Sequence, residues 1–394
     1  MPNILIIGNT SAAMAAVEEI RRTDTQSVVT LFCPEQTLPY DRSALPALLA
    51  KDIKETQVIL AHEKFFKEHD VKVVHNEALA RISVKRRQIT TENKNHFAFD
   101  KLLITDLPGV RLPAVKGHQK EGVFDVCRLS RVKEIIKAIP FSDTIVITVT
   151  SFLGFDMACS LSRLGKEIVL LCPPEGVLAE IFDDDTAALL KQIVETKNIR
   201  VITEPLEEIL GDAQVKAVRL KSGKVLAAEM VLFDNPVPDL RILEDTGLVQ
   251  DGRVAVGEFF NTPVENIAAC DAALGAYDLL AEESKLQGAC AAANLLNMGS
   301  KIFELPVILR DFGTAVCDGY CGGFVRLLEG GREHMKFDGP VNIYKKVFLL
   351  DDKLVGAVYF NAPLDRPKVL EALSARASLA GIEEEFLHSD PPPS

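Results

Sequence analysis

Two polar turns that follow apolar strands hold the residues of this sequence best suited to bind a phosphate group. The first turn follows the apolar residues 4–7 and consists of Gly8, Asn9, Thr10, Ser11, Ala12 and Ala13. The second consists of Ser151, Phe152, Leu153 and Gly154. An apolar run is typical of a buried parallel strand, and Ser or Thr is typical of a helix N-cap. Strand–turn–helix units aim free helix N–H groups at phosphate, so both turns are predicted phosphate sites.

The first turn matches the glycine fingerprint of dinucleotide-binding proteins in part. That fingerprint reads G-x-G-x-x-G/A. The first Gly is Gly8, the second position is Thr10, and the last is the permitted Ala13. An ordinary βαβ unit without a ligand is therefore the alternative to a dinucleotide site.

The opening pattern returns later in the chain. Residues 143–176 again read as strand, turn, helix and strand, and the second strand ends in LLCPPEG where the first copy has LFCPEQ. Two such cassettes predict two mononucleotide-binding folds. Hairpin-like segments separate the copies, which favours two domains over one large doubly wound domain.

The fold class predicted from these elements is α/β. It has two Rossmann-like FAD/NAD(P)-binding domains, one inserted in the other, and a small C-terminal α+β domain. We expect residues 1–112 and 235–302 to form the first domain and residues 113–234 the second. Residues 303–385 then form the α+β domain, and residues 386–394 a polar tail.

Composition limits the possible partners and locations. The chain has 394 residues with a net charge of −12, and 47% of its residues are hydrophobic. This is typical of a soluble globular protein, and the acidic balance argues against nucleic acid as a partner. We find neither a signal peptide nor an apolar stretch of about 18 residues, so we predict a cytoplasmic protein without membrane insertion.

The eight cysteines are scattered, and most stand in apolar surroundings. Buried free thiols in a reducing compartment are the simplest interpretation. Cys317 and Cys321 are too few to hold an iron–sulfur cluster alone. The seven histidines stand in polar segments and form no metal pattern, so we predict no metal site.

The chain resembles the pyridine nucleotide–disulfide oxidoreductase superfamily. The branch it resembles most contains NADH:rubredoxin reductase, NADH oxidase and the nitrite reductase flavoproteins. The turn GNTSAA, the segment LPYDRSAL and the segment NTPVENIAACDAALGAYDLL resemble, in order, the branch's opening turn, its PYxRPxL segment and its T-x-x-x-x-I-Y-A-A-G-D segment. The C-terminal domain resembles the family's domain for dimerisation or for docking an electron partner.

The resemblance implies a role for each matching residue. Residues 8–13 would face the FAD pyrophosphate, Glu35 would bind the adenosine ribose, and Arg42 would lie beside the flavin. Asp271 would bind the ribityl and phosphate side. Ser151, Phe152, Leu153 and Gly154 would form the NAD(P) turn, and Asp156 stands where a Glu near the nicotinamide is usual.

The sequence departs from the family pattern at several close-approach positions. Val149 stands where the second turn is expected to have Gly, and its Cβ is expected to crowd a tight turn. The family's A-T-G element reads Thr105, Asp106 and Leu107, and its counterpart contains Asp234. Cys270 replaces the Gly before Asp271. A carboxylate near a phosphate repels it, so these changes together raise the alternative of a flavoprotein fold that has lost one or both nucleotides. Val149 and Asp234 in particular predict a weak or empty second site.

The function implied by the resemblance is that of an FAD-dependent oxidoreductase, which passes electrons between NAD(P)H and a protein acceptor. Ser43 stands where peroxide- or coenzyme A-linked relatives have a cysteine, so no redox-active cysteine is expected. FAD is the predicted cofactor, and NAD(P) is the doubtful one. The alternative is a non-catalytic or NAD-deficient flavoprotein-like subunit of a larger redox complex. A homodimer is compatible with either function.

Overall fold

The computed structural model describes the chain except for residues 36, 173–181, 235, 297–302 and 389–394. The chain divides into two compact units, which are described separately. Unit 1 contains residues 1–114, 125–136 and 235–304. Unit 2 contains residues 115–124, 137–234 and 305–394. The three-domain division expected from the sequence stays a prediction.

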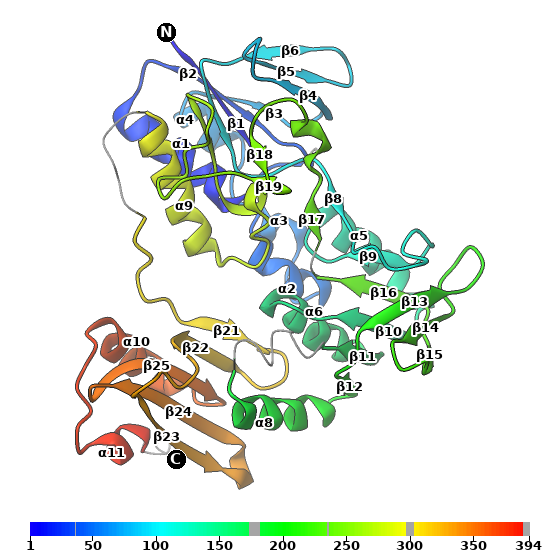
Figure 1. Ribbon diagram of the computed structural model, residues 1–394, viewed down its shortest axis with the longest axis vertical. Helices are drawn as coiled ribbons and strands as arrows, with labels where there is room; N and C mark the ends of the chain where they lie inside the picture. The colour runs from blue at the N-terminus through cyan, green and yellow to red at the C-terminus, as the bar shows by residue number, and fades with distance from the viewer. Residues whose placement is uncertain (36, 173–181, 235, 297–302, 389–394) are drawn as a thin grey trace. The chain divides into compact units, whose positions relative to one another are not determined.

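Unit 1 is built on a five-stranded parallel sheet with the order β20-β7-β1-β2-β3, of which Figure 1 labels β1, β2 and β3. Its strands are β1 (Asn3–Ile7), β2 (Val28–Phe32), β3 (Val71–Val74), β7 (Lys101–Ile104) and β20 (Ile267–Ala269). The apolar runs of the sequence form these strands because both faces of the sheet are covered.

Alternate residues of β1 face different layers. Ile4 and Ile6 pack with the helices α1 (Ser11–Thr23) and α9 (Ala281–Leu295). Leu5 and Ile7 pack with the antiparallel strands on the opposite face. Those strands are β4 (Leu79–Ser83), β5 (Gln88–Thr91) and β6 (His96–Ala98), and β4 and β5 form the hairpin expected there.

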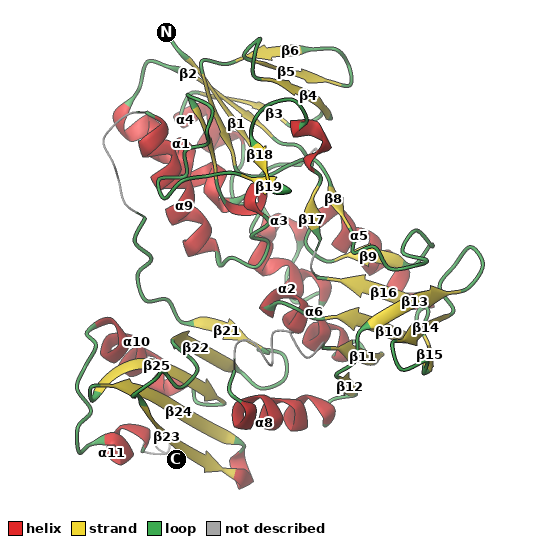
Figure 2. Cartoon of the chain, viewed as in Figure 1, coloured by secondary structure: helices red, strands yellow, loops and turns green. Residues whose placement is uncertain are grey.

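Shorter elements complete unit 1 (Figure 2). The helices are α2 (Leu45–Leu49), α3 (Glu55–Val58), α4 (Glu63–Glu68) and α5 (Leu129–Ala138), the last of which extends beyond the unit. The strand pairs are β8 (Val110–Arg111) with β17 (Val237–Pro238), and β18 (Val249–Gln250) with β19 (Arg253–Val254). A 3₁₀ turn, η4 (Asp271–Leu274), follows β20.

Unit 2 repeats the parallel design with the strand order β12-β11-β10-β16-β9. The strands are β9 (Val123–Asp125), β10 (Thr144–Thr148), β11 (Glu167–Leu171), β12 (Ile199–Ile202) and β16 (Met230–Phe233). The described helices of its N-terminal part are α6 (Phe152–Ser162) and α8 (Asp184–Glu195). A smaller antiparallel sheet contains β13 (Leu206–Leu210), β14 (Ala217–Leu220) and β15 (Val225–Ala227), and β14 and β15 form a hairpin.

The C-terminal part of unit 2 is an antiparallel sheet with the order β21-β22-β25-β24-β23. The strands are β21 (Arg310–Phe312), β22 (Gly319–Gly323), β23 (Arg332–Asp338), β24 (Ile343–Leu350) and β25 (Lys353–Phe360). The helices α10 (Arg366–Ser374) and α11 (Glu383–Leu387) contribute to its core. Lys346 is buried on β24, and its Nζ lies 3.0 Å from Oδ1 of Asp183, the residue that precedes α8. This ion pair joins the antiparallel sheet to the helix α8.

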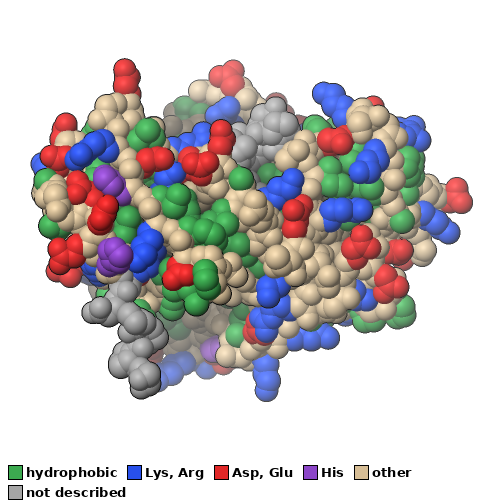
Figure 3. Space-filling model, turned by 90° about the horizontal axis from the view of Figure 1, so that it is seen from below, with side chains coloured by type: hydrophobic (Ala, Val, Ile, Leu, Met, Phe, Trp, Pro, Cys, Tyr) green, Lys and Arg blue, Asp and Glu red, His purple; other side chains and the backbone are tan. Residues whose placement is uncertain are grey.

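Large hydrophobic side chains are exposed on and next to β23. Figure 3 shows hydrophobic side chains gathered among acidic and basic ones on the face that it presents. Met335 and Phe337 on β23, and Val341 just after it, are about half exposed. Within the described residues, no helix is long and apolar enough to span a bilayer.

Candidate functional site

The first turn joins β1 to α1 and is held by hydroxyl groups. Gly8 has φ +155°, and a Cβ there would lie 1.8 Å from Oγ1 of Thr105, the residue that follows β7. Thr10 caps α1, because its side chain accepts a hydrogen bond from the Ala13 N–H. Thr10 Oγ1 also donates to Thr105 Oγ1 at 3.1 Å. A glycine is required here by the close approach of Thr105.

Asp271 lies beside this turn, as its place after β20 suggested. Its Oδ2 accepts a hydrogen bond of 2.7 Å from Ser284 Oγ on α9. Ser284 Oγ in turn accepts one of 2.9 Å from the Ala12 N–H. The backbone N–H of Asp271 donates to Gln287 Oε1. Burial raises the pKa of Asp271, and the charge of Arg42 opposes that rise. The sequence did not reveal Ser284 and Gln287, which carry these contacts.

Glu35 follows β2 and presents a buried acceptor without a partner. Tyr40 donates from its hydroxyl to Glu35 Oε1 at 2.6 Å. The Asn9 side chain accepts from the Glu35 backbone N–H at 3.0 Å. Among the described residues, Glu35 Oε2 is buried and has no hydrogen-bond partner. A buried unpaired acceptor is costly, so this atom suits a ligand with hydroxyl donors such as a ribose.

Arg42 is a buried cation with a partner of its own. Its Nη2 lies 3.3 Å from Asp106 Oδ2, its Nε donates to the Cys127 carbonyl at 2.8 Å, and its guanidinium carbon lies 5.2 Å from the centre of the Tyr277 ring. Burial raises the pKa of Asp106 to about 6, against the charge of Arg42. Asp106, which the sequence showed only as a departure from A-T-G, is thus the counterion of Arg42.

The residues around the first turn fit a dinucleotide. Glu35 Oε2 can accept a hydrogen bond from a ligand hydroxyl, and Arg42 supplies positive charge. The hydroxyl groups at the start of α1, those of Thr10, Thr105 and Ser284, are neutral. Arg42 and the Ala12 N–H are already engaged by Asp106 and Ser284. An anionic ligand would therefore compete with these internal partners for the same donors.

Three buried carboxyl groups, two in unit 1 and one in unit 2, predict a pH-dependent stability. Burial, together with the charge of Asp106, raises the pKa of Glu35 to about 7, and burial raises those of Asp106 and Asp234 to about 6. Unfolded carboxyls titrate near pH ~4, so the folded protein binds these protons more tightly. The resulting stability is complete below pH ~4 and is lost as the pH rises through about 6 to 7.

We therefore expect thermal denaturation to show a higher Tm near pH ~5.5 than near pH ~8, equivalent to about 2 kcal/mol. The variant Glu35→Gln removes the group with the largest raised pKa among these three and should flatten the profile. A Tm that is equal or higher at the alkaline pH would contradict this expectation.

Residues 149–151 join β10 to α6, and none of these three is a glycine. The Val149 N–H donates to the Leu171 carbonyl at 2.9 Å, as the Gly8 N–H donates to the Phe32 carbonyl. Val149 is fully buried, and its φ is not positive. The crowding expected from its Cβ does not arise, because the second turn avoids the backbone conformation that Gly8 adopts. Ser151 caps α6 by accepting from the Gly154 N–H.

Asp234 follows β16 and places its carboxylate against this turn. Its Oδ2 accepts hydrogen bonds from the Thr150 N–H (2.7 Å), the Ser151 N–H (2.8 Å) and Ser151 Oγ (2.7 Å). Its Oδ1 accepts from Thr150 Oγ1 at 2.9 Å. A Cβ on Gly154 would lie 2.2 Å from Asp234 Oδ2. Asp234 thus fills the close-approach position of the turn, and this position does not fit a pyridine nucleotide as it stands.

Other residues predicted at the second site contact the C-terminal part of unit 2. The ring centres of Phe152 and Phe312 are 5.5 Å apart. The guanidinium carbon of Arg310 lies 4.8 Å from the centre of the Phe152 ring. Asp156 Oδ1 accepts from the Gly313 N–H at 2.5 Å. Leu153 is buried. Their roles at a nucleotide stay predictions. The sequence also offers Glu175 as a ligand for a ribose, and this residue lies outside the described residues.

All eight cysteines are buried thiols. Burial and the charge of Glu35 raise the pKa of Cys33 to about 12, and burial raises that of Cys321 to about 12. A reactive thiol needs exposure and a lowered pKa, so these environments are the opposite of a redox-active one. Over the described parts of the chain, no group of three potential ligands could hold a metal ion.

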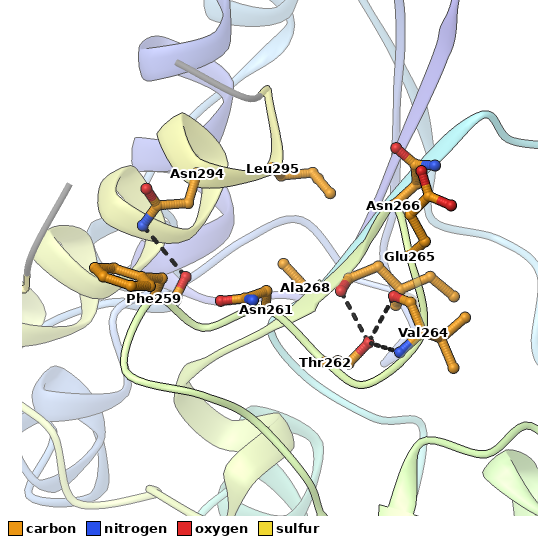
Figure 4. A pocket seen from close by; sticks show the side chains of 10 residues that line it. Phe259, Asn261, Thr262, Val264, Glu265, Asn266, Ala268, Asn294 and Leu295 are labelled. Atoms are coloured by element: carbon orange, nitrogen blue, oxygen red, sulfur yellow. Dashed lines mark hydrogen bonds between the residues drawn. The ribbon is translucent and has the colours of Figure 1, made fainter. Parts of the chain in front are cut away.

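A pocket of about 420 Å³ lies at the amino-terminal end of β20, where Asn266 precedes the strand (Figure 4). Thr262 Oγ1 donates to the Ile267 carbonyl and Asn294 Nδ2 to the Phe259 carbonyl. Ligands of parallel α/β sheets bind beyond the carboxyl ends of the strands. This pocket is therefore separate from the candidate site, which lies beyond the carboxyl end of β1.

Comparison with known proteins identifies the family. Residues 2–290 match the model of the pyridine nucleotide-disulphide oxidoreductases. The chain belongs to this family. The family and the α/β fold class with Rossmann-like domains that the sequence predicted are confirmed.

Individual relatives are distant. The chain is 20% identical over 393 residues to the assimilatory nitrate reductase electron transfer subunit of Bacillus subtilis, covering 98% of this chain and 51% of that one. It is 21% identical to the NADH-dependent phenylglyoxylate dehydrogenase subunit epsilon of Aromatoleum evansii, covering 97% and 94%. The covalent putidaredoxin reductase–putidaredoxin complex shows the same fold, with a TM-score of 0.80, 15% identity and 98% coverage of both chains. The chain spans about half the length of the first two curated relatives it matches.

Proposed function

We propose that this chain is an FAD-dependent oxidoreductase that holds the flavin in unit 1 and passes electrons to a protein partner without a redox-active cysteine. The observation that carries the proposal is a group of residues, here called the constellation, beside the β1–α1 turn. It consists of Glu35, whose Oε2 is unpaired, the buried Arg42 and the N-terminus of α1, which Thr10 caps. Family membership supports FAD as the ligand. The family's electron donor is NAD(P)H, as the sequence resemblance implied.

Each residue of the constellation has a distinct task. Glu35 would accept hydrogen bonds from the adenosine ribose, and the start of α1 with Arg42 would offset the negative charge of the pyrophosphate. Asp271 would orient the ribityl side while Ser284 holds its carboxylate. FAD itself supplies the electron chemistry, and the protein supplies binding, orientation and electrostatics.

A second candidate function is favoured by the carboxylate of Asp234 at the second turn. It is the NAD-deficient flavoprotein-like subunit of a larger redox complex. Two relatives carry the word subunit in their names, one of them as an electron transfer subunit. The mixed surface with Met335 and Phe337 on the C-terminal sheet supports a protein partner or a second copy docking there. We place the protein in the cytoplasm because its thiols are free.

The flavin proposal predicts a measurable loss in a variant of Asp271. After reconstitution with excess FAD, the purified protein should release one flavin per chain on denaturation, detected by fluorescence. Asp271→Asn should weaken FAD binding at least about tenfold, since it removes a charged contact. Asn tolerates the positive φ of +59° at this position, so the backbone is kept.

Asp239→Asn serves as the matched control, because the Asp239 carboxylate pairs with Arg241 at an exposed position of unit 1. It should bind FAD as the unaltered protein does. Absence of stoichiometric flavin after reconstitution would refute the proposal, and equal weakening by both variants would remove Asp271 from the site.

A further inference from the structure

Asp234 uses the groups of the second turn that a nucleotide phosphate would use. Its carboxylate accepts from two successive backbone N–H groups, those of Thr150 and Ser151, and from both of their hydroxyls. Helix α6 has eleven residues, and its N-terminus carries partial positive charge. An anion bound by adjacent N–H groups at the start of such a helix is the arrangement by which βαβ folds hold phosphate. Here the anion is the carboxylate of Asp234 rather than a ligand phosphate.

The first turn is arranged differently, although Asp106 stands two residues after β7 and Asp234 directly after β16. Asp106 is engaged by Arg42, and the Ala12 N–H at the start of α1 donates to the neutral hydroxyl of Ser284. A hydroxyl can yield to a phosphate without adding negative charge to the site. At the first turn the Asp271 carboxylate reaches the Ala12 N–H only through Ser284, whereas at the second turn Asp234 accepts directly from the backbone N–H groups.

Asp234 opposes a nucleotide in two ways. Its Oδ2 lies where a Cβ on Gly154 would be only 2.2 Å away, so the space for close approach of a ligand is taken. Asp234 is only 3% exposed, and a buried carboxylate beside a pyrophosphate repels it strongly. Displacing the Asp234 carboxylate would break these four hydrogen bonds. The buried negative charge would then have lost its donors, which is unfavourable.

We infer that the Asp234 carboxylate is a built-in substitute for a ligand phosphate and that the second nucleotide fold of this chain takes no pyridine nucleotide. The inference deepens the proposed function, on which it rests, by removing NAD(P)H as a direct reactant. Unit 2 then serves as a scaffold for the C-terminal sheet, to which Asp156 and Phe152 connect it. Reducing equivalents reach the chain through another protein.

The test is calorimetric titration of the FAD-reconstituted protein with NADH, NADPH and ADP-ribose. ADP-ribose carries the pyrophosphate but cannot be oxidised, so its binding is independent of flavin chemistry. The unaltered protein should bind none of the three at millimolar concentration. Asp234→Ala and Asp234→Ser free the turn and should gain ADP-ribose binding by at least about tenfold. The Ser hydroxyl keeps an acceptor at the turn, which protects the fold if the Ala variant is unstable.

Asp143→Ala is the matched control. Asp143 precedes β10 at the opposite end of the same sheet, its side chain is 96% exposed, and its loss changes the net charge equally. This variant should gain no binding. Micromolar binding of NADH by the unaltered protein would overturn the inference, as would folded Asp234 variants that gain nothing. Failure of the flavin proposal would show separately, as absent flavin in the reconstituted sample.

Discussion

Replacing Arg42 with methionine is expected to lower the free energy of unfolding by about 3–5 kcal/mol, measured by urea denaturation. Arg42 is only 9% exposed, and its guanidinium pairs with Asp106, donates to the Cys127 carbonyl and lies over the Tyr277 ring. Methionine keeps the apolar stem but leaves the Asp106 carboxylate buried without its cation. Breaking a buried ion pair from one side is costly, because the remaining charge has lost its solvent.

Arg22→Met provides the control for the loss of one arginine. Arg22 pairs with Glu19 on the surface of α1, and its side chain is 66% exposed. Solvent-exposed pairs contribute about 0–1 kcal/mol, so this variant should be nearly neutral. Combining Arg42→Met with Asp106→Leu should recover part of the loss, since no unpaired charge remains. Equal effects of Arg42→Met and Arg22→Met would show that the buried pair does not stabilise unit 1.

Substitution of Gly288 with alanine is expected to cost about 3 kcal/mol in the same measurement. Gly288 lies on α9, and a Cβ there would stand 2.0 Å from the Ala12 carbonyl oxygen at the start of α1. This neighbour is backbone, so the two helices themselves must separate. That separation would also stretch the hydrogen bond from the Ala12 N–H to Ser284, and FAD binding should weaken in parallel.

Gly257→Ala tests whether the effect depends on the helix contact. Gly257 has no positive φ, and a Cβ there would meet nothing closer than 3.8 Å. Its substitution should change the stability by less than about 1 kcal/mol. Similar losses at Gly288 and Gly257 would contradict close packing of α1 on α9.

The fold could be predicted from the sequence because its signals are local. Apolar runs ending in Gly8 or in Ser151 specify strand, turn and helix within a few residues, and the repeated cassette specifies two such folds. Asp271 could be placed for the same reason, since it follows an apolar strand whose carboxyl end must lie at the ligand edge of the sheet.

The internal partners of the site could not be predicted in this way. Arg42 and Asp106 are 64 residues apart in the chain, Ala12 and Ser284 are 272 apart, and Thr150 and Asp234 are 84 apart. Such pairs leave no periodicity or spacing in the sequence. The available signal was that an acid stands at each of two strand ends where a small residue is usual. The sequence indicates only the loss of a small residue at each position, whereas the structure shows that each acid has a partner.

The most direct test of the account is one anaerobic absorption spectrum of the FAD-reconstituted protein, recorded before and after adding NADH and then after adding dithionite. If unit 1 holds FAD and Asp234 closes the second turn, the flavin bands should appear, persist with NADH and bleach with dithionite. A colourless protein would contradict flavin binding beside Glu35 and Arg42. Rapid bleaching by NADH would contradict the closed second site and identify an ordinary NADH-dependent reductase.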